Sequence, residues 1–345
     1  MNKDFDPNGI GKNNSHFIGL PFNEKDAKIV LLAAPWDVTV SFGAGTSNAP
    51  KNILDCSPQL DLYDIDFPNE WKKGIYMRPS SKEWLQKNDV LRKKAEEHIY
   101  ALENELPIDI NLLKEVNTAC AEFHEFIYNE SKTLLSKDKL VGLIGGDHST
   151  PFGYLKALSE IHDDFGILQL DAHMDLRQAY EGFNYSHASI FYNITKQNPS
   201  VSKLIQIGIR DYCEAEITYA KENNISYFTD SSIKKQLFNG ITWDTVCEDI
   251  LSKLPQKVYF SLDIDGLNPA LCPTTGTPVP GGLSFEQLIY LLEKILKSGR
   301  TLIGFDLCEV GISEWDGNVG ARIIYKLCSM WLYTDTKMKK DIFEK

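Results

Sequence analysis

The sequence lacks the segments that mark a membrane or secreted protein. No apolar run in its 345 residues approaches the roughly 20 residues that span a bilayer, and residues 1–8 lack the apolar core of a signal peptide. The seven cysteines are scattered and never spaced as Cys-x-x-Cys, which argues against a disulfide framework and against a zinc ribbon. We therefore expect a cytoplasmic protein whose cysteines are mostly reduced and buried.

Positive charge and nucleophile motifs are also scarce. The formal net charge of −12 opposes non-specific binding to nucleic acid or to a membrane surface, and it favours a cationic small-molecule substrate. The sequence has no Gly-x-Ser-x-Gly elbow, no motif for a Cys–His dyad and no Gly-x-x-x-x-Gly-Lys-Ser/Thr phosphate loop. Neither a side-chain nucleophile nor a nucleotide-phosphate site is therefore indicated.

What is present is an alternation of strand and helix patterns, regular from residue 112 onward. Strands are expected at 28–36, 141–144, 167–170, 204–210, near 225, at 258–262 and at 301–305, and helices at 88–105, 112–135, 151–162, 215–223, 243–254, 285–298 and 320–333. This alternation predicts an α/β fold with a mostly parallel sheet covered on both faces. Residues 1–27 are expected to form an irregular N-terminal arm and residues 28–345 a single domain. Within that domain, the spacing of apolar residues in 36–90 fits neither a helix nor a strand consistently.

Potential metal ligands follow four of the apolar runs. The run that ends at Leu170 leads into Asp171, His173 and Asp175, whose side chains would share one side if the strand continued that far. Three further runs lead into Gly145-Gly146-Asp147-His148, Asp263-Ile264-Asp265-Gly266 and Asp306-Leu307-Cys308-Glu309. Because ligand sites of parallel sheets lie beyond the carboxyl ends of the strands, we expect these groups to meet at one edge.

The combined set of donors is too large for one tetrahedral zinc ion. Oxygen-rich sets of this kind favour Mn²⁺ or a similar ion, and bridging carboxylates allow two cations to share a water molecule that becomes the nucleophile. A lone aspartate at a strand end is more often a helix cap, and Asp147 is expected to be a cap or to support a ligand. The six candidate ligands are His148, Asp171, His173, Asp175, Asp263 and Asp265.

These motifs resemble those of the ureohydrolases, the arginase and agmatinase superfamily. The resemblance rests on Gly-Gly-Asp-His-Ser at 145–149, Asp-Ala-His-Met-Asp at 171–175 and Ser-Leu-Asp-Ile-Asp-Gly-Leu-Asn-Pro at 261–269, and it extends to 276–283. It implies a three-layer α/β/α sandwich that assembles as a homotrimer or homohexamer, with two divalent metal ions per subunit, Mn²⁺ or in some relatives Ni²⁺. It implies one metal held by His148, Asp171, Asp175 and Asp263, and the other by Asp171, His173, Asp263 and Asp265.

The resemblance also implies the reaction, which is hydrolysis of a guanidino carbon to urea and an amine. Glu309 matches the guanidinium-binding glutamate, His187 the proton-shuttling histidine, and Thr277 a residue of the same pocket. Asp175 is expected to act in catalysis as well as in metal binding. An imidazole near pH 7 can deliver the proton that the leaving amine requires, although a packing role at a helix start is the alternative for His187.

The expected pocket departs from the arginase pattern. Arginases have an asparagine near Arg177 and a second aspartate at the position of Cys213, so arginine is disfavoured as the substrate. Arg177 could bind a substrate carboxylate or pair with an acidic side chain, while Trp315 and Trp36 could narrow the pocket.

We expect an agmatinase-like enzyme that takes a small cationic guanidino substrate. A guanidine hydrolase or a guanidino-acid hydrolase such as guanidinobutyrase comes next, followed by an arginase or a formiminoglutamase. Formiminoglutamases share the Asp-Leu-Arg pattern of residues 175–177 but commonly lack the histidine found here at 187. A mononuclear zinc deacetylase and a non-catalytic relative are the alternatives from other classes.

Overall fold

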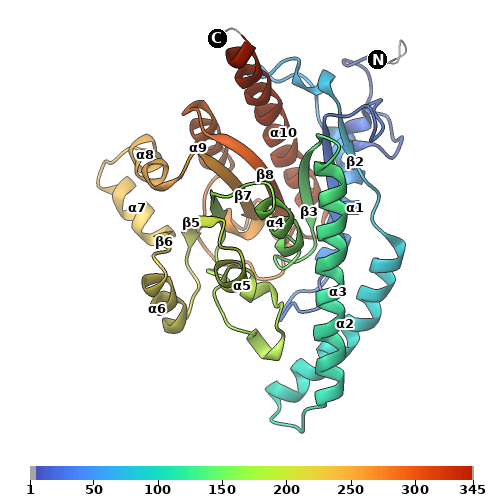
Figure 1. The fold of residues 1–345 in the computed structure, drawn as a ribbon, viewed down its shortest axis with the longest axis vertical. Helices are drawn as coiled ribbons and strands as arrows, with labels where there is room; N and C mark the ends of the chain where they lie inside the picture. Colours follow the sequence, from blue (N-terminus) through green and yellow to red (C-terminus); the bar gives the residue numbers. More distant parts are fainter. Residues whose placement is uncertain (1–4, 344–345) are drawn as a thin grey trace.

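The computed structural model describes the backbone of residues 5–343 and the side chains of residues 5–335. One 8-stranded sheet, in the order β2-β1-β3-β8-β7-β4-β5-β6, is parallel at every pairing between neighbouring strands (Figure 1). The strands are β1 (Ile29–Ala34), β2 (Ile75–Met77), β3 (Leu140–Gly145), β4 (Phe165–Leu170), β5 (Val201–Ile209), β6 (Ser226–Thr229), β7 (Lys257–Asp263) and β8 (Thr301–Cys308). Central strands such as β4 are buried throughout, which explains their nearly continuous apolar sequence.

Helices cover both faces of this sheet. One layer contains α1 (Ala49–Cys56), α7 (Asp230–Phe238), α8 (Trp243–Lys253), α9 (Phe285–Lys297) and α10 (Glu314–Phe343). The other contains α2 (Lys82–Glu103), α3 (Ile110–Leu135), α4 (Phe152–Ser159), α5 (Ile190–Gln197) and α6 (Glu214–Glu222). Alternate residues of β1 enter different apolar clusters, Ile29 on the first side and Val30 on the second. The predicted three-layer α/β/α sandwich with a parallel sheet is therefore confirmed.

The sequence patterns missed four elements and misplaced some boundaries. The helix α1 and the edge strand β2 lie in the stretch of mixed period, and the helices α5 and α7 were not expected. The helix α2 begins at Lys82, several residues earlier than predicted, because the Ser81 side chain caps it by accepting the Trp84 N–H. The boundary at residue 27 stays a prediction, although Phe17 and Leu20 are buried in the same cluster as Ile29.

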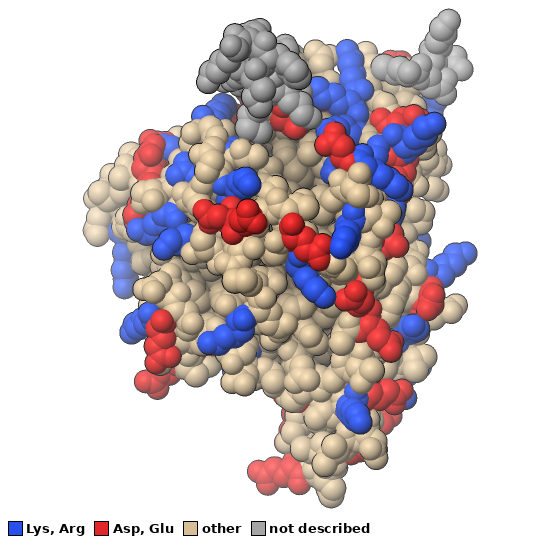
Figure 2. Space-filling model, in the orientation of Figure 1, with Lys and Arg blue, Asp and Glu red and all other residues tan. Residues whose placement is uncertain are grey.

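The surface mixes charges of both signs. On the face shown in Figure 2, Lys and Arg side chains are interspersed with Asp and Glu over the described part of the molecule. Within residues 5–343, no helix is long and apolar enough to cross a bilayer. All seven cysteines are free thiols, and the five on α3, α8, β8, α10 and the loop at Cys272 are buried.

Candidate metal centre

The centre forms where four adjacent strands end. In the sheet, β3, β8, β7 and β4 are consecutive neighbours, and all of them run in the same direction. His148 follows β3, Glu309 follows β8, Asp263 ends β7, and Asp171 follows β4. All four side chains are buried. The sheet order therefore brings together residues that are far apart in the sequence.

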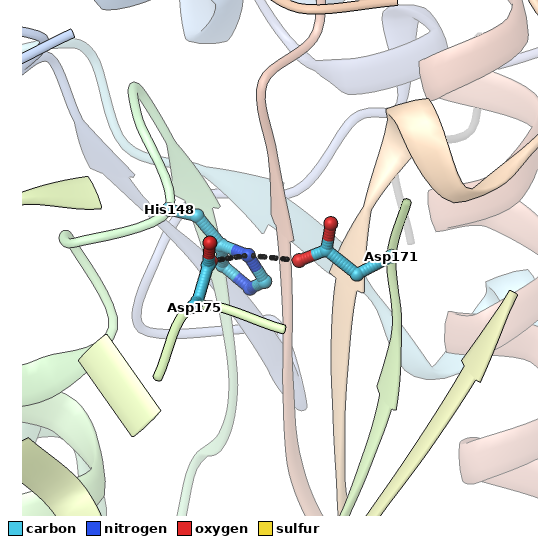
Figure 3. Close-up of side chains that lie close together, drawn as sticks. All are labelled: His148, Asp171 and Asp175. Carbon is cyan, nitrogen blue, oxygen red and sulfur yellow. Dashed lines mark hydrogen bonds and ion pairs between the residues drawn. The ribbon is translucent and has the colours of Figure 1, made fainter. Parts of the chain in front are cut away.

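A first group of ligand atoms surrounds His148. Its Nδ1 lies 2.9 Å from Asp171 Oδ2, 3.2 Å from Asp175 Oδ2 and 3.5 Å from Asp263 Oδ2. In Figure 3, dashed lines join the carboxylates of Asp171 and Asp175 to the His148 ring. One donor atom from each of these three residues lies within 4.8 Å of the others, which is a spacing that a single cation could bridge.

A second group shares Asp171 with the first. His173 Nδ1 lies 3.1 Å from Asp265 Oδ2 and 3.5 Å from the other oxygen of Asp171, Oδ1. Donor atoms of these three residues also lie within 4.8 Å of one another. The structure thus brings all six predicted ligands together, with Asp171 common to both groups. Four carboxylates and two imidazoles in two groups fit a pair of divalent cations, and their individual roles as ligands stay predictions.

The ligands converge through a turn, so the condition that the strand continue to Asp175 is not met. The strand β4 ends at Leu170, and His173 makes only an isolated bridge to Asp211. Asp175 has a φ of 53° and Glu309 a φ of 59°, in the left-handed region that few residues other than glycine occupy. Such strain is typical of functional sites, where the surrounding structure holds a side chain in one direction.

Burial of this many carboxylates changes their acidity. Burial, reinforced by the neighbouring Asp171 charge, raises the pKa of Asp175 to about 7. Burial also raises the pKa of Asp263 and of Glu309 well above the usual range, with Asp265 adding to the effect on Asp263. For Asp171, burial is outweighed by hydrogen bonds from His148 and His173, which hold its pKa below the ordinary value. A cation would relieve the repulsion between these carboxylates.

A cavity of about 160 Å³ opens onto the two groups of ligands. The predicted catalytic and substrate residues that line it are His187, Glu309, Asp175, Thr277 and Arg177. Glu309 Oε1 accepts the backbone N–H of His148 at 3.0 Å, which ties the carboxylate to the metal groups. His187 Nδ1 lies 3.1 Å from the carbonyl oxygen of Thr39, and burial lowers the pKa of His187 to about 4.

Two predicted pocket residues lie elsewhere. Trp315 is half exposed, its indole N–H donates to the Ala270 carbonyl at 2.9 Å, and it is not among the residues that line the cavity. Trp36 is fully buried and stacks on Phe123 with ring centroids 4.6 Å apart, so it belongs to the core. The expectation that these two indoles narrow the pocket is therefore not supported.

Comparison with known proteins assigns the chain to a family. The sequence model of the arginase family matches residues 27–329. The chain belongs to the arginase family. It is 31% identical to an N(1)-aminopropylagmatine ureohydrolase of Thermus thermophilus, over 84% of this chain and 87% of that protein. It is 26% identical to an agmatinase of Pyrococcus horikoshii, over 83% and 84%. The crystal structure of an agmatine ureohydrolase of Thermoplasma volcanium matches its fold with a TM-score of 0.70 at 21% identity, over 94% and 96%.

These relatives make the chain an agmatinase-like member of the arginase family. It is a hydrolase that acts on C–N bonds of linear amidines. The two groups of Asp and His residues around His148 and His173 could hold metal ions. The expected alternatives from other classes, a zinc deacetylase and a protein that is not an enzyme, are thereby set aside.

The mouth of the cavity in this arginase-family enzyme has charged residues that the motifs did not reveal. Arg177 Nε lies 3.7 Å from Glu216 Oε2, and the guanidinium stacks over the Tyr180 ring at 4.7 Å. Glu216 is buried and also accepts the backbone N–H of Leu176 at 3.1 Å. Asp211 follows the end of β5 and is 69% exposed at its side chain. The rule that ligands follow strand ends would have found Asp211 if it had been applied to β5.

Proposed function

We propose that this enzyme hydrolyses a guanidino compound whose far end has a second positive charge, agmatine in the first place, and releases urea and an amine. The observation that carries the proposal is the distribution of charge along the cavity. Buried carboxylates lie at its inner end, and an exposed carboxylate, Asp211, lies at its mouth. A substrate with a cation at each end complements both.

At the inner end, Glu309 is suited to orient the guanidinium. Its carboxylate is held by the His148 N–H at 3.0 Å, and the Thr275 hydroxyl donates to the Glu309 carbonyl oxygen at 2.7 Å. These two contacts fix a residue whose backbone is in the left-handed region. Two Mn²⁺ ions held by the six ligands would acidify a water molecule and so supply a nucleophile at neutral pH.

His187 is suited to move the proton that the leaving amine requires. The Thr39 carbonyl can only accept a hydrogen bond, so Nδ1 of a neutral His187 must be the protonated nitrogen. Its Nε2 then keeps a lone pair, with which it can take up a proton and return it to the amine. The ring is near the ligands, since the cavity lining includes His187 with His173 and Asp175.

The far end of the cavity argues against a guanidino acid. A substrate carboxylate would need the charge of Arg177, which already faces Glu216 and stacks on Tyr180. Among the described residues, the group paired with Asp211 is the His173 imidazole, at 4.0 Å. An ammonium group therefore meets a favourable charge at the mouth, and a longer amine such as N(1)-aminopropylagmatine could extend past this exposed residue.

The deciding experiment is a urea-release assay of the Mn²⁺-loaded and the Ni²⁺-loaded protein. The substrates are agmatine, N(1)-aminopropylagmatine, arginine, guanidinobutyrate and guanidine, with formamide measured for formiminoglutamate. We expect the highest kcat/KM with agmatine or its aminopropyl derivative. Faster turnover of guanidinobutyrate would overturn the argument from Arg177, and formamide release without urea would overturn the proposed reaction.

Metal content and assembly are proposed along with the substrate. We expect two metal ions per subunit, Mn²⁺ before Ni²⁺, which elemental analysis of the purified protein measures. A homotrimer or homohexamer and a cytoplasmic location stay predictions. Light scattering of the protein as it elutes from a size-exclusion column measures the oligomeric state, and fractionation of the source cells shows the location.

A further inference from the structure

Four buried polar residues form a row across the centre of the sheet, just below the metal ligands. Gln206 on β5 pairs with Gln169 on β4, Gln169 pairs with Ser261 on β7, and Ser261 pairs with Asp306 on β8. All four are 0% exposed. Buried polar side chains in otherwise apolar strands are costly unless each one is hydrogen-bonded. We call these residues the polar row.

The polar row lies on the same side of the sheet as the ligands. Gln169 precedes Asp171 by two residues, and Ser261 precedes Asp263 by two residues, which is the period of a strand. Ile167 and Tyr259 lie on this same side of the sheet, and both belong to the apolar cluster formed with α2 to α6. This side of the sheet therefore faces that layer of helices. The row is therefore placed to contact the centre from beneath.

One half of the polar row is directed at Asp171. Gln206 Nε2 donates to Gln169 Oε1 at 2.6 Å and to the Met174 carbonyl at 2.7 Å. Gln169 Nε2 in turn donates to Asp171 Oδ2 at 2.7 Å and to the His173 carbonyl at 3.2 Å. Each amide nitrogen faces two acceptors, so the orientation of both amides is determined. Gln206 thus fixes which end of the Gln169 amide meets Asp171.

The other half of the polar row is directed at His148. The Ser261 hydroxyl donates its one proton to Asp306 Oδ2 at 2.7 Å, so Ser261 Oγ can only accept from His148 Nε2, at 3.0 Å. In the neutral imidazole of His148, the proton is therefore on Nε2. The lone pair of Nδ1 then points toward the oxygens of Asp171, Asp175 and Asp263. A metal cation could bind that lone pair and the three carboxylates together, in place of the proton that Nδ1 otherwise takes up.

We propose that the polar row positions the metal ligands before metal binds. Gln169, held by Gln206, sets the rotation of the Asp171 carboxylate, and Ser261, held by Asp306, selects the His148 tautomer whose Nδ1 can bind metal. The four are positioning residues, since among the described residues they make no hydrogen bond to the side chains of Glu309, His187 or Asp211. The inference rests on the proposed metal centre but not on the identity of the substrate.

The first test is a calorimetric titration of the metal-stripped variants Gln169→Met and Ser261→Ala with Mn²⁺. Each change removes the hydrogen bond to a ligand and leaves a side chain of similar or smaller volume. We expect the metal dissociation constant to rise by about 10- to 100-fold in each variant. With the best substrate of the urea assay, at saturating Mn²⁺, we expect kcat to fall while KM changes by less than about 2-fold, because the substrate-binding side chains are untouched.

A matched control separates positioning from general packing. Ser131 on α3 is also a 0% exposed serine, and its hydroxyl has no hydrogen-bond partner among the described residues. Ser131→Ala makes the same chemical change as Ser261→Ala but away from the centre, and we expect unchanged metal affinity. A purely structural role of the polar row would lower the melting temperature of the metal-free variants and leave the metal dissociation constant at the wild-type value, which would overturn the proposal.

The two halves of the polar row can be tested separately. Gln206→Met leaves the donor of Gln169 in place but removes its orientation, so we expect a smaller rise in the metal dissociation constant than for Gln169→Met. In the double variant the two effects should not add, because both act through Asp171. Fully additive effects would overturn this half. If Gln169→Met does not fold, Gln206→Met and Ser261→Ala still decide the proposal, and the titration needs no substrate, so its failure is distinct from failure of the urea assay.

Discussion

Removal of metal should make the stability of this protein depend on pH in an unusual direction. In the metal-free folded protein, burial raises the pKa of Asp175 from 3.8 to about 7. Between these values the folded state binds more protons than the unfolded state, so the free energy of unfolding falls as the pH rises. With about 1.4 kcal/mol for each pH unit, the whole shift corresponds to about 4 kcal/mol, of which about 2 kcal/mol is lost between pH 5.5 and pH 8.

The raised pKa values of Asp263 and Glu309 act in the same direction, and so do those of His148 and His173. Burial opposes the charge on both imidazoles, but the neighbouring Asp carboxylates outweigh it and raise their pKa values. Asp171 opposes the trend, since its pKa is lowered. A loss of about 2 kcal/mol is large beside the roughly 5–15 kcal/mol of a typical domain. It should lower the melting temperature by roughly 3–5 °C or more.

The assay is differential scanning calorimetry of the protein in chelator and in Mn²⁺, from pH 5.5 to pH 8. Bound cations keep the carboxylates ionised, and metal affinity rises with pH, so the gap in melting temperature between the two forms should widen as the pH rises. In Asp175→Asn the metal-free protein should lose less stability over the same range. A metal-free melting temperature that is constant or rises toward pH 8 would refute the reasoning.

Four further predictions concern single side chains. Asp263→Ala should abolish urea release and reduce the metal content, because it removes a carboxylate 3.5 Å from His148 Nδ1; turnover at the wild-type rate would contradict the metal-dependent reaction. His187→Ala should lower kcat by about 10²-fold or more with the metal content unchanged, as measured by urea release and elemental analysis. Asp211→Asn should lower kcat/KM for agmatine by about 10-fold and should leave that for guanidine, which has no far end, within about 2-fold. His124→Phe should stabilise the protein at pH 5 by about 2 kcal/mol, because burial lowers the pKa of His124 to about 3, so that the unfolded state alone takes up a proton there; chemical denaturation at pH 5 and pH 8 measures the difference.

Much of the fold could be predicted because its signals are local and repeated. Runs such as 165–170 and 257–263 are mostly apolar, as expected for strands buried on both faces, and the helices between them have apolar residues at helical spacing. The missed elements are short or lie at an edge. β2 has three residues, and α1 has eight and is joined to short helical turns at both ends, so neither gives a periodic pattern long enough to recognise.

The site was predictable wherever a ligand lies close to a strand end. All six proposed ligands lie at the end of β3, β4 or β7 or in the segment that follows it, because parallel strands deliver their carboxyl ends to one edge. The contact between Arg177 and Glu216 depends on how the loop after β4 meets the helix α6, which spacing along the chain does not reveal. Trp315 was misplaced for the same reason. The polar row did leave a signal, a polar residue one to three positions before the strand end in mostly apolar segments, and this signal is recognisable only once the register between strands is known.

The order of the strands determines when the centre can exist. His148 and Asp171 are separated by 23 positions in the chain, yet β8 and β7, made from the last third of the sequence, lie between their strands in the sheet. A growing polypeptide that has only reached residue 250 therefore has four of its six proposed ligands but no scaffold to align them. Capture of the cations becomes a late event of biogenesis, and any truncated product that lacks β8 should leave the ribosome unable to retain them.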